Sequence, residues 1–225
     1  MRCILTENKP GCEKPLADRL LKELSDPGNQ RVLWLVTGGS NLKLSVAIME
    51  QIPDELTKKL AVALTDERFG PVGHPDSNLQ QLFDAGFQPK RATVVPVLTP
   101  GLPLDATAER YSNLITTAFE AADVIIAQFG IGPDGHIAGV LPDTIGVSSK
   151  DIVVGYETPQ FNRVTLTLEA IKTIPVAYVF CFGGERHDAL DKLCNKDIPL
   201  ADEPSQILKQ VAESYVYNDQ VGETS

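Results

Sequence analysis

The segment "VIIAQFGIGPDGHIAGVLP", Val124 to Pro142, joins an apolar, β-branched run to a glycine-rich turn. Its glycines Gly130, Gly132 and Gly135 have the G-x-G-x-x-G spacing of a dinucleotide-binding turn. A dinucleotide site also needs a long helix that starts at the third glycine. Here only six residues separate that glycine from the proline, and proline disfavours a helix through this point. The segment therefore predicts a strand followed by a loop that presents His136, and not a nucleotide site.

Short apolar runs alternate with amphipathic segments of helix length along the whole chain. The apolar runs predict strands at Val32–Thr37, Leu60–Thr65, Thr93–Val97, Val124–Phe129, Val164–Leu168 and Val176–Phe182. The amphipathic segments predict helices at Lys14–Leu24, Leu42–Gln51, Asn78–Phe83, Ala106–Ala121, His187–Cys194 and Ser205–Glu213. This alternation predicts a single α/β domain over residues 1–225, with three α/β/α layers around a mostly parallel sheet.

The composition limits the classes of partner. The chain has 225 residues, and its formal net charge of -10 disfavours binding to nucleic acid and to anionic membranes. The N-terminal residues lack the apolar region of a secretory signal, and no apolar run approaches the length of a membrane span. We therefore expect a cytoplasmic protein, monomeric or a small homo-oligomer, with no nucleic-acid or membrane partner.

The four cysteines are Cys3, Cys12, Cys181 and Cys194. None forms a C-x-x-C pair, and Cys181 lies inside an apolar run. The spacing predicts buried or incidental thiols in a reducing compartment, and neither a metal site nor a redox site.

The loops that follow the predicted strands are the places to look for a site, because ligands of open α/β sheets bind beyond the carboxyl ends of the strands. The first loop, "TGGSN", is followed by a helix. Its glycines Gly38 and Gly39 allow a tight turn with inward-pointing N–H groups, and Ser40 or Asn41 can cap the helix. The loop is either an anion site at a helix N-terminus or a simple turn from strand to helix.

A second loop, "TDERFGPVGHPDSN", brings three charged residues to the end of a buried strand. They are Asp66, Glu67 and Arg68, and the arginine is able to hold a phosphate or carboxylate through two parallel hydrogen bonds. His74 lies in the Gly/Pro-rich part of this loop, and we interpret it chiefly as a loop residue.

The third loop presents Asp134 and His136. Histidine has the side-chain pKa nearest neutrality and suits proton transfer, while a neighbouring carboxylate fixes its tautomer. His187 begins a predicted helix and is expected at the surface. Arg163 and Arg186 are either ordinary surface charges or a source of positive charge for the cleft of an acidic protein.

Four motifs in this order, "TGGS", "TDERFGPVGHPDSN", "GIGPDGHIAGVLP" and "RVTLTLEAI", resemble the 6-phosphogluconolactonase family. The superfamily also contains glucosamine-6-phosphate deaminase and ribose-5-phosphate isomerase, and the resemblance covers the chain from about Leu33 to the C-terminal helix. It implies a NagB/RpiA-like fold and hydrolysis of 6-phosphoglucono-δ-lactone to 6-phosphogluconate in the oxidative pentose phosphate pathway. The resemblance implies no cofactor and no metal.

The resemblance also implies roles for individual residues. His136 would be the general base that activates water, with Asp134 beside it, and Arg68 would contact the phosphate or the ring hydroxyls. The implied substrate-binding residues are Gly38, Gly39, Ser40, Asp66, Glu67, Arg68, Asn78, Gly130, Gly132, Arg163 and Arg186. The last of these stands where the family usually carries a phosphate-binding lysine. The chain also departs from the usual motifs at Asn41, Leu42, Ile137, Gly139 and Leu141.

Two alternatives stay open. "GIGPDGHIA" also resembles the deaminases, which typically continue "FNEP" with a glutamate that supports the histidine; here Leu141, which cannot titrate, precedes Pro142. Their strand-end motif usually reads "DEY", against "DER" here. The other alternative is a catalytically silent sugar-phosphate sensor. Related regulators carry a DNA-binding helix-turn-helix, which this acidic chain is not expected to have.

Overall fold

The computed structural model describes residues 1–224 and contains a sheet of eight strands in which every neighbouring pair is parallel. The spatial order is β11 (Glu223–Thr224), β1 (Arg2–Leu5), β10 (Glu213–Asn218), β9 (Val176–Cys181), β6 (Val124–Phe129), β2 (Val32–Val36), β3 (Leu60–Leu64) and β5 (Thr93–Val95). The predicted α/β fold with a mostly parallel sheet is confirmed.

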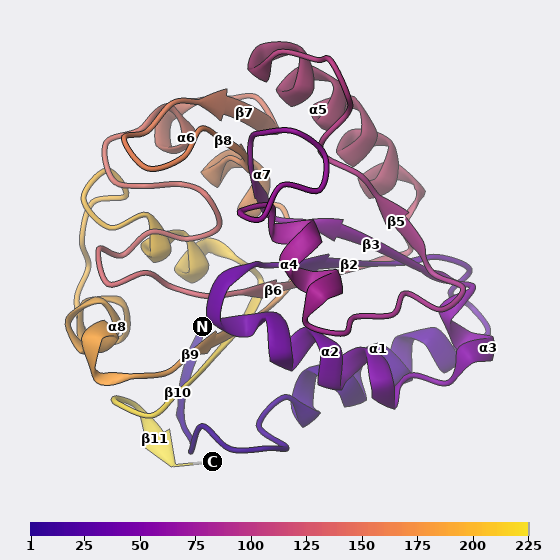
Figure 1. The fold of residues 1–225 in the computed structure, drawn as a ribbon. Coiled ribbons are helices and arrows are strands. Elements are labelled where there is room, and N and C mark those ends of the chain that lie inside the picture. The colour runs from indigo at the N-terminus through magenta and orange to yellow at the C-terminus, as the bar shows by residue number, and fades with distance from the viewer. Residues whose placement is uncertain (225) are drawn as a thin grey trace.

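Helices cover both faces of this sheet. Figure 1 shows α1 and α2 below the sheet and α5 above it. The helices are α1 (Lys14–Ser25), α2 (Leu42–Gln51), α3 (Asp54–Thr57), α4 (Asn78–Asp84), α5 (Leu104–Ala121), α6 (Ile145–Ser148), α7 (Leu168–Ile171) and α8 (His187–Asn195). Three 3₁₀ turns are η1 (Gly39–Asn41), η2 (Gly184–Arg186) and η3 (Pro204–Gln210). No helix within residues 1–224 is long and apolar enough to cross the hydrocarbon layer of a membrane.

The core lies along the central strands, where both faces of the sheet are covered. All five residues of β2 are buried, and its Trp34 packs against Phe87 with ring centroids 6.0 Å apart. Every residue of β9 is buried as well. Continuous apolar strands are stable here because helices or the second sheet remove both faces from water.

A second, antiparallel sheet has the order β4 (Asp66–Arg68), β8 (Arg163–Leu166) and β7 (Val153–Tyr156). Only Thr65 separates the end of β3 from the start of β4, so one continuous segment contributes to both sheets. The pairing sets Arg68 directly opposite Arg163. The small sheet thus brings the charges of two distant motifs together.

The predicted helix at Ser205–Glu213 is wrong. Its first part is the 3₁₀ helix η3, and Glu213 begins strand β10. In β10 the residues Ser214, Val216 and Asn218 are buried and alternate with less buried ones, which is the two-residue period of a strand. The predicted strand Val164–Leu168 also ends early, because the Thr167 hydroxyl caps helix α7.

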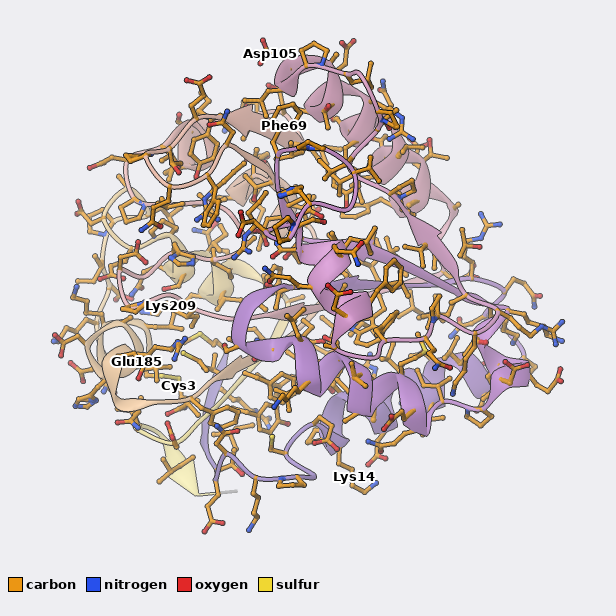
Figure 2. The ribbon with its side chains drawn as sticks, viewed as in Figure 1. Cys3, Lys14, Phe69, Asp105, Glu185 and Lys209 are labelled. Atoms are coloured by element: carbon orange, nitrogen blue, oxygen red, sulfur yellow. A yellow bond between two sulfur atoms is a disulfide. The ribbon has the colours of Figure 1, made fainter. Side chains whose placement is uncertain are left out.

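The prediction that all four cysteines are thiols is wrong for Cys3 and Cys194. These residues form a disulfide between β1 and α8 with their Cα atoms 6.2 Å apart, and Figure 2 labels Cys3. A separation of 191 residues gave no spacing signal for the pair. Cys12 and Cys181 are buried free thiols, and burial raises the pKa of Cys181 to about 12.

Candidate active site

A cavity of about 230 Å³ lies at the carboxyl ends of β2, β3, β6 and β9, where ligands of open α/β sheets bind. Three loops that follow these strands, the β4–β8 pair and the turn before β8 form its walls. The lining residues are Thr37, Gly38, Gly39, Ser40, Asp66, Arg68, Asn78, Gly130, Ile131, Gly132, Pro133, His136, Ala138, Gln160, Phe161, Arg163 and Arg186. The structure therefore gathers the predicted motifs around one cavity.

His136 lies on the loop after β6, and Asp134 supports its ring. The Nδ1 atom of His136 is 2.5 Å from Oδ1 of Asp134, and the imidazole is 31% exposed. The hydrogen bond with His136 lowers the pKa of the Asp134 carboxyl. Because an ionised carboxylate only accepts hydrogen bonds, this contact favours the tautomer with its proton on Nδ1 and leaves the Nε2 lone pair to act as a base.

Two glycines shape this loop. The N–H of Gly135 donates to the carbonyl of Gly132 at 3.0 Å, and Gly135 has φ +77°, which favours glycine. A Cβ on Gly132 would lie 2.7 Å from Oδ1 of Asp134 and even closer to the imidazole of His136. The absence of a side chain at position 132 thus makes room for the Asp134–His136 pair.

The turn after β2 forms another part of the cavity wall. Gly39 has φ +68°, and a Cβ on Gly38 would overlap the amide of Asn78. The prediction that Ser40 or Asn41 caps the helix is wrong, because neither side chain makes a capping bond. The Asn41 amide instead donates to the carbonyls of Phe129 at 3.0 Å and Phe180 at 3.1 Å. These bonds tie the turn to the ends of β6 and β9.

Arg68 and Arg163 give the cavity positive charge. Arg163 is only 8% exposed, and its nearest carboxylate, that of Asp66, lies 3.8 Å away. Arg68 donates to the carbonyl of Asp76 at 3.1 Å. The Nε atoms of both arginines are buried and have no hydrogen-bond partner in residues 1–224. Buried donors of this kind favour an anionic ligand.

Arg186 also lines the cavity, from η2 after β9. Its Nε donates to the carbonyl of Ile131 at 3.1 Å and its Nη1 to that of Phe182 at 2.7 Å. The guanidinium also pairs with Glu185. The backbone therefore fixes this arginine beside the loop that carries His136.

Asn78 lines the cavity, whereas Glu67 lies behind its wall. Asn78 is 1% exposed. Its side-chain N–H donates to the carbonyl of Asp66 at 2.9 Å, and its buried Oδ1 has no partner within residues 1–224. Glu67 does not line the cavity. It accepts hydrogen bonds from the backbone N–H groups of Arg68, Asn78 and Leu79, and burial raises its pKa. Glu67 therefore anchors the start of α4 behind the cavity wall.

The two remaining histidines lie outside the cavity. His74 has its Nε2 atom 2.9 Å from the carbonyl of Arg68, which fits its interpretation as a loop residue. His187 is exposed at the start of α8, as predicted. Among residues 1–224, no group of three or more His, Cys, Asp or Glu side chains is placed to hold a metal ion.

Sequence reasoning missed six residues of the cavity wall, namely Thr37, Ile131, Pro133, Ala138, Gln160 and Phe161. The first four are neighbours of predicted positions in the same motifs. Gln160 and Phe161 come from the turn between β7 and β8. No signal pointed to them, because β7 was not predicted.

Comparison with known proteins agrees with this geometry. Residues 9–217 match the family described as glucosamine-6-phosphate isomerases/6-phosphogluconolactonase. A 6-phosphogluconolactonase of Thermotoga maritima is 31% identical over 61% of this chain and 63% of its own length. One of Synechocystis is 27% identical over 91% of this chain and 88% of its own.

The fold is also similar to that of a solved 6-phosphogluconolactonase structure. A crystal structure of a 6-phosphogluconolactonase from Shewanella baltica superposes with a TM-score of 0.82 at 17% identity, covering 97% of each chain. The family match includes every residue that lines the cavity and leaves out strands β1 and β11 at the ends of the chain. This protein is therefore a member of the glucosamine-6-phosphate isomerase/6-phosphogluconolactonase family.

Proposed function

We propose that this protein hydrolyses 6-phosphoglucono-δ-lactone to 6-phosphogluconate, the second step of the oxidative pentose phosphate pathway. The observation that carries the proposal is the Asp134–His136 pair, 2.5 Å apart, at the edge of a cavity that also contains three arginines. A histidine base beside a cationic cavity suits a lactone that carries a phosphate. The relatives named as 6-phosphogluconolactonases support the same activity.

The reaction needs a base, an oxyanion site and a proton for the leaving oxygen. In the proposed mechanism, Nε2 of His136 takes a proton from water, and the hydroxide attacks the C1 carbonyl. Backbone N–H groups of the glycine turns stabilise the oxyanion that forms. When the bond from C1 to the ring oxygen breaks, His136 returns its proton to that oxygen. Asp134 stabilises the imidazolium between the two transfers.

Substrate binding uses the remaining groups of the cavity. Arg68, Arg163 and Arg186 would attract the phosphate, and the N–H groups of the 38–40 turn would contribute further donors. Asp66 and Asn78 line the cavity as well, and we expect them to bond sugar hydroxyls. We further expect a cytoplasmic protein that is monomeric or a small homo-oligomer.

The first test is hydrolysis of freshly generated 6-phosphoglucono-δ-lactone, followed through coupled 6-phosphogluconate dehydrogenase. His136→Ala should lower kcat by about 10²–10⁴-fold, the usual contribution of a general base. His187→Ala is the matched control, because that histidine is exposed outside the cavity, and it should leave kcat unchanged. A His136→Ala variant with the wild-type rate above the spontaneous background would remove His136 from the mechanism.

Activity on glucosamine 6-phosphate is the alternative function, since the family includes glucosamine-6-phosphate isomerases. The wild-type protein should release no ammonia from glucosamine 6-phosphate, because Leu141 precedes Pro142 where deaminases carry a glutamate. Ammonia release without lactone hydrolysis would establish deamination instead. A folded protein that binds 6-phosphogluconate and accelerates neither reaction would be a sugar-phosphate sensor.

A further inference from the structure

Phe161 contacts two arginines of the cavity. It lies in the turn between β7 and β8, is half-buried and lines the cavity. The guanidinium carbon of Arg68 is 5.1 Å from the centroid of its ring, and that of Arg163 is 5.9 Å away. Both distances lie within the range of cation–π attraction.

The two arginines need such a contact because their charges repel. They lie directly opposite each other on the antiparallel strands β4 and β8, where like charges destabilise the pairing. The carboxylate of Asp66 is 3.8 Å from Arg163, which is too far for a strong hydrogen bond. The electron-rich ring of Phe161 attracts both guanidinium groups without neutralising either of them. Both therefore keep their positive charge for a ligand.

The backbone holds Phe161 in place. The hydroxyl of Thr158 donates to the carbonyl of Phe161 at 2.6 Å, and the N–H of Phe161 lies 3.1 Å from the same hydroxyl oxygen. The next residue, Asn162, accepts a bond from the N–H of Phe69 at 2.7 Å. These bonds fix the turn against the segment that carries Arg68. The ring is thus positioned before a ligand arrives, which lowers the entropic cost of binding.

We propose that Phe161 is a positioning residue that keeps Arg68 and Arg163 together as an anion clamp and thereby determines the affinity for the phosphate of the ligand. The inference rests on the proposed function, in which the substrate is a phosphorylated lactone. Phe161 affects phosphate binding through the arginines, whereas the chemical step depends on His136, which lies on the separate loop after β6. Loss of the ring should therefore raise KM and leave kcat nearly unchanged.

The test compares Phe161→Leu and Phe161→Tyr with the wild type. The leucine keeps apolar volume but removes the π face, and the tyrosine keeps both. Phe161→Leu should weaken binding of 6-phosphogluconate about 5- to 30-fold, as the loss of two partly exposed cation–π contacts predicts, and should raise KM for the lactone equally. Binding of gluconate, which lacks the phosphate, should change less than twofold. Phe161→Tyr should restore the wild-type values.

A second phenylalanine, Phe83, provides the control variant. Phe83→Leu changes an exposed phenylalanine of α4 outside the cavity and should alter neither constant. Equal weakening of both ligands by Phe161→Leu, a fall in kcat instead of a rise in KM, or failure of the tyrosine to restore binding would overturn the inference. A wild type that binds no 6-phosphogluconate would do so as well.

The outcomes also separate this inference from the proposed function. Lactone hydrolysis by the wild type, together with unchanged phosphate-dependent binding in Phe161→Leu, would refute the clamp and leave the activity intact. Binding that depends on Phe161 in a protein that does not hydrolyse the lactone would support the clamp and refute the activity. The binding measurement requires no turnover, so each result is informative by itself.

Discussion

Gly132→Ala tests whether the space around His136 is as important as the histidine itself. The added Cβ would lie 2.7 Å from Oδ1 of Asp134 and closer still to Nδ1 and Cε1 of His136. Real Cβ atoms essentially never approach heavy atoms below 3.0 Å, so the imidazole must move. Since the ring is 31% exposed, it is free to turn toward solvent without disturbing the core.

The expected magnitude follows from this displacement. A turned imidazole loses its 2.5 Å bond to Asp134 and moves away from the position where it would activate water. A misplacement of about 1 Å costs about 10²-fold in rate, and complete loss of a general base costs up to about 10⁴-fold. We therefore expect kcat for lactone hydrolysis to fall by about 10²–10⁴-fold in Gly132→Ala. The corresponding increase of the barrier is about 3–5 kcal/mol.

The assay is the coupled hydrolysis of freshly generated lactone, with the melting temperature of each variant measured in parallel. Gly184→Ala is the matched control, because a Cβ there meets no atom within 4 Å, and it should keep the wild-type rate. Gly132→Ala should melt within a few degrees of the wild type. A folded Gly132→Ala protein with kcat within threefold of the wild type would refute the steric reasoning about the Asp134–His136 pair.

Two further predictions concern stability. Cys3→Ser removes a disulfide that closes a loop of 191 residues, and it should lower the free energy of unfolding by about 2–5 kcal/mol. Dithiothreitol should lower the melting temperature of the wild type to that of the variant. No effect of dithiothreitol on the wild type would contradict the bond. The hydrogen bond with His136 lowers the pKa of Asp134 in the folded state. The ionised carboxylate therefore stabilises the fold at pH values above its unfolded pKa of about 3.9. This stabilisation is lost as the pH falls through the lower pKa of the folded state. The stability advantage of the wild type over Asp134→Asn, measured by urea unfolding, should shrink as pH falls below about 4, and an advantage that grows with acidity would contradict it.

The central strands were predictable because their burial leaves a direct pattern in the sequence. Strand β6 runs from Val124 to Phe129 as predicted, since a parallel strand covered on both faces is nearly continuously apolar. Strands β1 and β7 have only four residues each and lack such a run. Strand β10 has a two-residue alternation and was not predicted, and its first residue, Glu213, was assigned to the end of a helix. Short or one-sided strands depend on their neighbours for stability, and a single sequence does not display those neighbours.

The same distinction applies to the site. Asp134, His136 and Arg68 were predictable because their chemistry is compressed into short motifs. The contact of Phe161 with two arginines arises from the register of a sheet whose strand β7 was not predicted. The bond between Cys3 and Cys194 likewise joins segments 191 residues apart, β1 and α8, and no local pattern in the sequence indicates that they meet. Disulfides are typical of oxidising compartments, so cytoplasmic location stays a prediction that the redox state of this pair will test.

The charge of the cavity would allow an acidic protein to hold the anionic ligand of the proposed function. The chain carries a net charge of -10, which repels anions at long range. Arg68 contacts the carbonyl of Asp76, and the ring of Phe161 contacts both Arg68 and Arg163. Contacts of this kind position a guanidinium without cancelling its charge, whereas a close carboxylate would compete with the ligand. Asp66, 3.8 Å from Arg163, is near enough to orient that side chain and too far to bind it in place of a phosphate.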